Sequence, residues 1–322
     1  MILALIDHDS GNLNPVSLEM LTLARDVAGE AGTSLEAAIV GENGRLLAEE
    51  VATYGVDKVH LVSHDRLDSY TPEAWARSLA QLANALSPEA VFGPGTDRGN
   101  ELMAHLGAIL DQPLAANCTA VSPGAPYTVT RVRWGGSLLE EAEVRGDLPL
   151  FTVAPHALEA EAVSPSDPAV ETFTPELEEN AFRVRLAERV ETGEDKVSLG
   201  EARLVVGGGR GVGSEEGFAI LEALADALGG AVGGSRVVTN LGWRAHADQI
   251  GQTGARIAPD LYIACGISGA IQHMVGAKGA KQILAINTDR EAPIMAKADY
   301  AVIGDLHEVV PAIIEAIKAK GN

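Results

Sequence analysis

Apolar and polar residues alternate along the first 110 residues in two patterns, one typical of strands and one typical of helices. Short runs rich in β-branched residues, such as ILALID at 2–7 and KVHLV at 58–62, are each followed by a longer amphipathic stretch. The stretches TPEAWARSLAQLANAL at 71–86 and DRGNELMAHLGAIL at 97–110 repeat apolar residues at helical spacing. This order of elements predicts a parallel sheet covered by helices.

The pattern changes from about residue 118. Four strand-like segments, CTAVS, YTVTRVRW, GSLLEEAEV and LFTVAPH, follow one another there. Because no helical stretch separates them, they predict an antiparallel extension of the sheet. Prolines and acidic residues then dominate 163–196, and we place a domain linker toward the end of this segment, near 190–200.

A second alternation of strands and helices begins at ARLVVGGGRG, residues 202–211. Ser214 is the expected N-cap of the next helix, and Gly229 its expected end. The strands AVGGSR, LYIACG, QILAIN and YAVIGD follow, with a short helix before the last strand and a long helix at 306–320. We therefore predict two α/β domains. Residues 1–195 form a Rossmann-like parallel sheet with an antiparallel extension, and residues 196–322 form a doubly wound, flavodoxin-like sheet.

Charge and composition exclude several classes of protein. The formal net charge is −21, and nucleic-acid binding depends on Lys and Arg that neutralise phosphates, so no nucleic-acid partner is expected. No apolar run approaches the ~20 residues of a membrane span. The first residues lack the basic region of a signal peptide, which predicts a cytoplasmic protein. Cys118 and Cys265 lie far apart in apolar segments and are expected to be buried, reduced thiols.

Small and polar residues follow the strands of the second domain in place of ordinary turn residues. Ligands of open parallel sheets bind beyond the carboxyl ends of the strands, so these loops would line one crevice. Taken singly each loop is weak evidence, because none matches G-x-G-x-x-G or the P-loop. The loops are GGGRG at 207–211, GGSR at 233–236, CGISGAIQH at 265–273, INTD at 286–289 and GD at 304–305.

The contents of this crevice suggest its ligand. Free backbone N–H groups at Gly266, Ser268 and Gly269 would suit a phosphate, and Arg210 could add a charge-assisted contact. Further polar side chains could serve a ribose or pyrophosphate (Asn287, Asp305) and a conjugated ring (Arg236, Gln249, Thr253, His273). This set describes a dinucleotide. No nucleophile–base pair or carboxylate dyad accompanies it, which points to electron or hydride transfer by the cofactor.

Plain structural roles remain open for the same residues. Ser268 could be an N-cap, His273 an ordinary hydrogen-bonded histidine, and Arg210 and Arg236 surface residues. No metal site is predicted, because the other histidines form no cluster with ligand spacing: His8, His64, His105, His156, His246 and His307.

Long motifs in the second domain closely resemble the α subunit of electron transfer flavoproteins, including the FixB branch. They are VVGGGRGVGSEEGFAILEALADALGGAVGGSR, QIGQTG, PDLYIACGISGAIQHMVGAKGAKQILAIN, EAPIM and ADYAVIGDLHEVVP. The resemblance covers about the last 120 residues and continues more loosely through NELMAHLGAILDQPLAANCTAV and GGSLLEEAEV. Two segments depart from the family at unchanged length, WRAHADQ at 243–249 and NTDREAP at 287–293, so the cofactor pocket is expected to be kept.

The resemblance implies an electron-carrying subunit of a heterodimer rather than a stand-alone enzyme. In this family one FAD lies mostly in the second domain of the α chain, and a β subunit completes the site and usually carries AMP. The FAD takes electrons from dehydrogenases, such as the acyl-CoA dehydrogenases of fatty acid β-oxidation. It passes them to a quinone oxidoreductase or another acceptor, which is the only expected link to a membrane.

Carried over by motif, the expected FAD contacts include Arg236, Thr253 and His273 near the isoalloxazine ring. The full set is Arg210, Ser235, Arg236, Gln249, Ile250, Gly251, Gln252, Thr253, Gly266, Ser268, Gly269, Ala270, Ile271, Gln272, His273, Asn287, Asp305 and Leu306. Two alternatives stay open. One is the α subunit of an NADH-dependent electron-bifurcating complex with a second FAD on the β subunit, and the other is a nucleotide-sensing module without redox chemistry.

Overall fold

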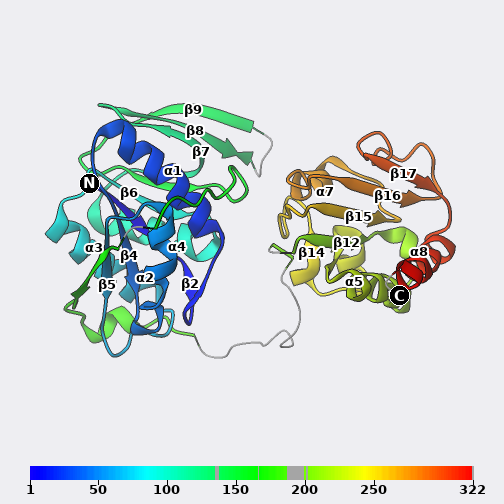
Figure 1. The fold of residues 1–322 in the computed structure, drawn as a ribbon, viewed down its shortest axis with the longest axis horizontal. Coiled ribbons are helices and arrows are strands. Elements are labelled where there is room, and N and C mark those ends of the chain that lie inside the picture. Colours follow the sequence, from blue (N-terminus) through cyan, green and yellow to red (C-terminus); the bar gives the residue numbers. More distant parts are fainter. Residues whose placement is uncertain (135–137, 166, 187–198, 201, 321–322) are drawn as a thin grey trace. The chain divides into compact units, whose positions relative to one another are not determined.

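The computed structural model describes residues 1–134, 138–165, 167–186, 199–200 and 202–320. The chain divides into two compact units, Met1–Val190 and Glu191–Asn322, each built around its own sheet (Figure 1). The predicted boundary between residues 195 and 196 falls in 187–198, outside the described residues. Both units are of the α/β class, as predicted.

The first unit has a nine-stranded sheet in its described residues. Neighbours pair in parallel from β11 to β7, and β8 and β9 then add antiparallel pairs at one edge. This confirms the predicted parallel sheet with an antiparallel extension, visible in Figure 1 beside β7. In sheet order the strands are β11 (Ala169–Phe173), β5 (Lys58–Val62), β4 (Leu35–Val40), β1 (Ile2–Leu5), β6 (Ala90–Pro94), β10 (Leu150–Val153), β7 (Leu114–Ser122), β8 (Tyr127–Arg133) and β9 (Leu138–Val144).

Helices cover both faces of this sheet. One face packs against α1 and α2 through residues such as Met20 and Val51, and the other packs against α3 and α4 through Trp75 and Met103. The helices are α1 (Val16–Ala31), α2 (Leu47–Val51), α3 (Pro72–Leu86) and α4 (Asp97–Leu110), and a two-stranded hairpin, β2 (His8–Asp9) with β3 (Asn12–Leu13), lies outside the main sheet.

Two strands of the first unit differ from the sequence-based expectation. LFTVAPH was grouped with the antiparallel segments, but β10 inserts between β6 and β7 and is parallel to both. β11 was not predicted, because AVETF lies in the acidic, proline-rich segment and its first four residues are exposed. It extends the edge of the sheet by pairing in parallel with β5.

The second unit has an entirely parallel sheet in its described residues. Its five longer strands are arranged 2-1-3-4-5, the flavodoxin order that was predicted, and a two-residue strand adds to one edge. In sheet order they are β14 (Gln249–Ile250), β13 (Ala231–Ser235), β12 (Leu204–Gly208), β15 (Leu261–Cys265), β16 (Ile283–Asn287) and β17 (Tyr300–Ile303). The strand order reverses between β12 and β15.

Helices α5 (Ala219–Leu228) and α8 (Leu306–Lys320) pack on one face of this sheet through Leu221 and Val310. The other face packs against α7 (Ile271–Gly276) and the segments around Ile257 and Ile294. A short helix, α6 (Arg236–Asn240), follows β13. No helix among the described residues is both long and apolar enough to span a membrane.

The local signals around α5 are confirmed. The Ser214 hydroxyl accepts a hydrogen bond from the Gly217 N–H at 3.2 Å, although the first turn is a 3-10 helix rather than α-helix. Gly229 ends the helix with φ +67°, in the left-handed region. The short helix expected before β17 is absent, because residues 288–299 form turns and irregular backbone instead. Cys118 and Cys265 are buried and free, as expected.

Candidate functional site

A cavity of about 620 Å³ lies at the carboxyl ends of the strands of the second unit. It collects the loops that follow β12, β13, β14, β15 and β16, and the switch point of the sheet between β12 and β15 lies among them. Ligands of doubly wound sheets bind at this position. The loop after β17, with Gly304 and Asp305, does not line the cavity.

The loops after β12 and β15 touch through backbone atoms. A Cβ on Gly211 would lie 2.7 Å from the Cα of Gly266, and a Cβ on Gly266 would lie the same distance from the Cα of Gly211. The Gly211 N–H donates to the Gly266 carbonyl at 3.1 Å. Side chains at either position would push the two loops apart, so the glycines hold the base of the cavity together.

The loop from Ser268 to Ala270 carries free backbone donors. The N–H groups of Ser268, Gly269 and Ala270 have no hydrogen-bond acceptor among the described residues, whereas the Gly266 N–H, also expected to be free, donates to the Ile286 carbonyl at 2.9 Å. Gly269 has φ +80°, and a Cβ there would lie 2.5 Å from the backbone nitrogen of Ile294. Only glycine fits this turn, and the turn leaves its amides available to a ligand.

Asn287 braces the same loop from the end of β16. Its amide nitrogen donates to the Ile267 carbonyl at 3.0 Å, and its amide oxygen accepts from the Asp289 N–H at 3.0 Å. Both ends of the side chain are therefore engaged within the protein. The bonds place Asn287 in the cavity wall as a support of the loop.

Two arginines in the cavity lining have no acidic partner in the described part of the chain. Arg210 and Arg236 form no ion pair with any described residue, although the chain has 45 acidic residues. Arg244, just outside the cavity, is paired twice, with Glu222 and with Asp248. The two free guanidinium groups give this cavity a positive local charge on an acidic protein, which suits an anionic ligand.

Gln249 joins two walls of the cavity. The side chain is 1% exposed, its Oε1 accepts from the Thr239 hydroxyl at 2.8 Å, and its Nε2 donates to the Thr253 hydroxyl at 2.9 Å. Thr239 belongs to α6, which begins at Arg236, and Thr253 lies in the loop after β14. The amide thereby fixes the position of the Thr253 hydroxyl relative to α6.

His273 is a buried histidine in the first turn of α7. Its Nε2 lies 2.7 Å from the hydroxyl of Tyr262, while its Nδ1 is buried and makes no hydrogen bond with the described residues. Burial lowers the pKa of His273 to about 4, and the backbone carbonyl of Ile250 opposes this shift only in part. The side chain is therefore neutral at pH 7, and among the described residues Nδ1 has only the nearby Ile250 carbonyl, which does not meet the geometry of a hydrogen bond.

The family-divergent segment 243–249 is tied to the rest of the unit by Arg244. Its guanidinium contacts Glu222 on α5 and Asp248, and lies 5.4 Å from the centre of the Phe218 ring. These contacts hold the 3-10 turn that leads directly into Gln249. The changed sequence therefore forms a braced surface turn.

The structure brings most of the predicted site residues together. Those that line the cavity are Arg210, Ser235, Arg236, Gln249, Ile250, Gly251, Gln252, Thr253, Gly266, Ser268, Ala270, Gln272, His273 and Asn287. Four others lie outside its lining. Gly269 contacts Ile294, Ile271 is 72% exposed, Asp305 accepts from the His307 N–H at the start of α8, and Leu306 is buried in the core.

Several lining residues were not singled out from the sequence. Asp289 and Gly209 lie within the predicted loops, whereas Ala292 and Val237 gave no polar signal. Tyr262, which contacts His273 without lining the cavity, gave no such signal either, because it belongs to an apolar strand. Its contact with His273 depends on the fold, and no sequence pattern predicts it.

Comparison with known proteins gives a consistent result for both units. The family model described as "Electron transfer flavoprotein domain" matches residues 2–178, and "Electron transfer flavoprotein FAD-binding domain" matches 198–278. The chain is 40% identical to the electron transfer flavoprotein subunit alpha of Mycobacterium leprae, over 99% of this chain and 98% of that protein. It is 36% identical to the subunit of the same name from Thermoanaerobacterium thermosaccharolyticum (97% and 96%) and 38% identical to the protein FixB of Clostridium saccharobutylicum (97% and 94%).

Proposed function

This chain belongs to the electron transfer flavoproteins as an α subunit, and we propose that it binds one FAD in the cavity of its second unit. The observation that carries the proposal is that one cavity holds both unoccupied hydrogen-bond donors and arginines without ion-pair partners among the described residues. Among the residues that the structure describes, Arg210 and Arg236 lack acidic partners, the amides of Ser268 to Ala270 lack acceptors, and His273 Nδ1 is buried without a hydrogen bond. These groups match a ligand with a pyrophosphate and a polar ring.

Each wall of the cavity has its own role in this proposal. The 268–270 amides and Arg210 bind the pyrophosphate, because backbone donors and a guanidinium both favour anionic oxygens. Arg236, Thr253 and His273 contact the isoalloxazine ring, where Gln249 fixes the hydroxyl of Thr253. Bound FAD supplies the redox chemistry, and the protein supplies binding, orientation and electrostatics.

The α-subunit family implies a heterodimer with a β subunit. We propose that the first unit packs on that β subunit and that the β subunit carries AMP. Acyl-CoA dehydrogenases or related dehydrogenases donate the electrons, and a quinone oxidoreductase or a similar acceptor receives them. The complex acts in the cytoplasm, and it contacts a membrane only through its acceptor.

Cofactor analysis of the complex tests this proposal. The full chain is co-expressed with its β subunit, the complex is purified, and nucleotides released by denaturation are identified and counted. One FAD and one AMP per heterodimer is the expected result. Two FAD per heterodimer would show the bifurcating type instead, and a colourless complex that holds ADP or NAD would contradict electron transfer altogether.

A further inference from the structure

Tyr262 and His273 form a buried pair beneath the cavity. The Tyr262 side chain is completely buried, His273 is 7% exposed, and the hydroxyl oxygen lies 2.7 Å from Nε2. Gly207 provides the space for this contact, because a Cβ there would lie 2.3 Å from the Tyr262 hydroxyl. The phenol thus reaches from β15, past a glycine on β12, to the ring of a residue on α7.

Hydrogen-bond accounting fixes the direction of this bond. His273 Nε2 is the one partner of the Tyr262 hydroxyl among the described residues. A buried hydroxyl that donated to nothing would lose a hydrogen bond without compensation, so its hydrogen points to Nε2. Nε2 must then carry no proton, because a neutral imidazole has one accepting and one donating nitrogen.

The remaining proton of the imidazole therefore lies on Nδ1. That nitrogen is buried and meets the geometry of a hydrogen bond with none of the described residues, although the backbone carbonyl of Ile250 lies near enough to the ring to raise its pKa, and His273 itself lines the cavity. Burial also lowers the pKa of His273 to about 4, which keeps the ring neutral at physiological pH. A neutral ring has two tautomers, and a contact to one nitrogen decides which atom can donate to a ligand.

We propose that Tyr262 is a positioning residue that holds His273 as the Nδ1–H tautomer and so presents a neutral hydrogen-bond donor to the ligand of the cavity. The identity of that ligand as FAD rests on the proposed function, whereas the tautomer follows from the protein alone. The ring donates to an acceptor atom of the ligand without bringing a positive charge. The fixed positive charge of this wall then comes from Arg236.

Nitrogen NMR of the imidazole rings tests the tautomer directly. The complex of the full chain with its β subunit is labelled with ¹⁵N-histidine, and the signals of His273 are assigned by their loss in His273→Gln. The parent protein is expected to show a protonated Nδ1 and an unprotonated Nε2 at pH 7. A protonated Nε2 would overturn the proposal without any variant.

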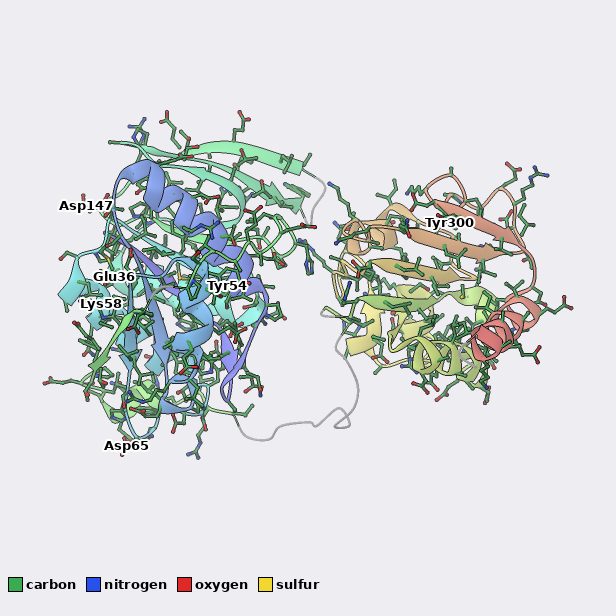
Figure 2. All side chains as sticks on the ribbon, viewed as in Figure 1. Glu36, Tyr54, Lys58, Asp65, Asp147 and Tyr300 are labelled. Atoms are coloured by element: carbon green, nitrogen blue, oxygen red, sulfur yellow. The ribbon has the colours of Figure 1, made fainter. Side chains whose placement is uncertain are left out.

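Tyr262→Phe removes only the hydroxyl and keeps the ring that fills the core. In this variant both His273 nitrogens are expected to shift toward values averaged over the two tautomers, because Nε2 has lost its donor. Tyr300→Phe is the matched control, since Tyr300 lies on β17 of the same sheet and is 58% exposed (Figure 2). Unchanged His273 signals in Tyr262→Phe, or equal changes in the control, would remove Tyr262 from this role.

Cofactor retention separates this inference from the proposed function. Loss of one oriented neutral hydrogen bond should weaken FAD binding by up to about tenfold in Tyr262→Phe, and the control should bind as the parent does. If the parent complex binds no FAD, the proposed function fails, while the NMR result still decides the tautomer. If FAD binds equally to Tyr262→Phe and the His273 signals do not move, the inference alone fails.

Discussion

The amide nitrogen of Gln249 donates to the hydroxyl of Thr253 at 2.9 Å, and this bond decides where the free hydrogen of Thr253 can point. Because the hydroxyl oxygen accepts from Gln249, its own hydrogen remains available to another acceptor. The other end of the amide accepts from Thr239 on α6 at 2.8 Å. One buried side chain therefore links α6 to the loop after β14.

Replacement of Gln249 by leucine should loosen both walls of the cavity. The side chain is buried, so the change removes its two hydrogen bonds, although the Thr239 hydroxyl keeps the Arg236 carbonyl and the exposed Thr253 hydroxyl can turn to water. The expected loss is therefore that of two ordinary hydrogen bonds, each about 0.5–1.5 kcal/mol. We expect a lower melting temperature and weaker retention of FAD. Gln282→Leu is the control, because Gln282 is an exposed glutamine of the same unit. Equal melting temperatures for the parent and Gln249→Leu would contradict the bracing role.

Local sequence signals were sufficient for most elements of the fold. The spacing of apolar residues predicted α3 and α4 because each of these helices buries one face against the sheet. β11 was missed because an edge strand pairs on one side only and needs few apolar residues. The parallel insertion of β10 depends on contacts with two strands distant in sequence, which no local pattern records.

The sequence predicted those site residues that lie in the loops after strands. It did not predict the contacts that depend on how side chains pack in the folded unit. Gly266 and Arg210 follow strands, so their meeting at one edge of the sheet follows from the topology. The turn that replaces the expected short helix is built from side-chain bonds, in which Asn287 accepts from the Asp289 N–H and Asp289 from the Glu291 N–H. Tyr262 reaches His273 only because β12 has a glycine beside it.

A side chain at Gly269 should abolish FAD retention. Its φ of +80° disfavours any other residue, and a Cβ would lie 2.5 Å from the Ile294 nitrogen, so Gly269→Val must displace the 268–270 amides. The first unit should remain folded, because its core is separate. Gly229→Val is the control, since Gly229 also has a positive φ, +67°, but no atom within 4 Å of the added Cβ. The measurement is the ratio of FAD to protein after gel filtration, and an unchanged ratio in Gly269→Val would exclude the loop from the site.

Acid should destabilise the second unit through His273. The pKa of this residue is about 4 in the folded protein and near 6.5 in the unfolded chain, so between these values the unfolded chain binds more protons. Stability is therefore complete above about pH 6.5 and falls as the pH drops toward 4, by a total on the order of 3 kcal/mol.

Thermal unfolding of the parent and His273→Gln between pH 5 and 7.5 measures this effect. As the pH falls, the melting temperature of the parent should drop more than that of the variant, because glutamine does not titrate. His246→Gln, at an exposed histidine of the same unit, should follow the parent at every pH. A difference that stays constant over the whole range would mean that His273 is not held neutral by the fold.

Loss of Arg236 should lower the first reduction potential of the bound flavin. Added negative charge on the ring is stabilised by a fixed cation, and Arg236 lines the cavity without an acidic partner among the described residues. A charge-assisted hydrogen bond contributes roughly 1.5–3 kcal/mol when it is shielded from water. Arg236 is exposed in the chain alone. If the β subunit covers Arg236, we expect its contribution to lie in the upper part of this energy range. If Arg236 stays exposed to water, screening should reduce the shift of the reduction potential to tens of millivolts.

Reductive titration of the reconstituted heterodimer measures that shift in Arg236→Ala. Arg203→Ala is the matched control, because Arg203 is paired with Asp260 and precedes β12, so it lies at the amino end of that strand, whereas the cavity lies at the carboxyl ends of the strands. It removes the same charge from the unit without removing it from the cavity wall, so its potential should equal that of the parent. Arg210→Ala should weaken FAD binding with a smaller change in potential, because its proposed contact is the pyrophosphate. If Arg236→Ala and Arg203→Ala shift the potential equally, the effect is one of net charge, and control of the flavin would rest on the neutral donors Thr253 and His273.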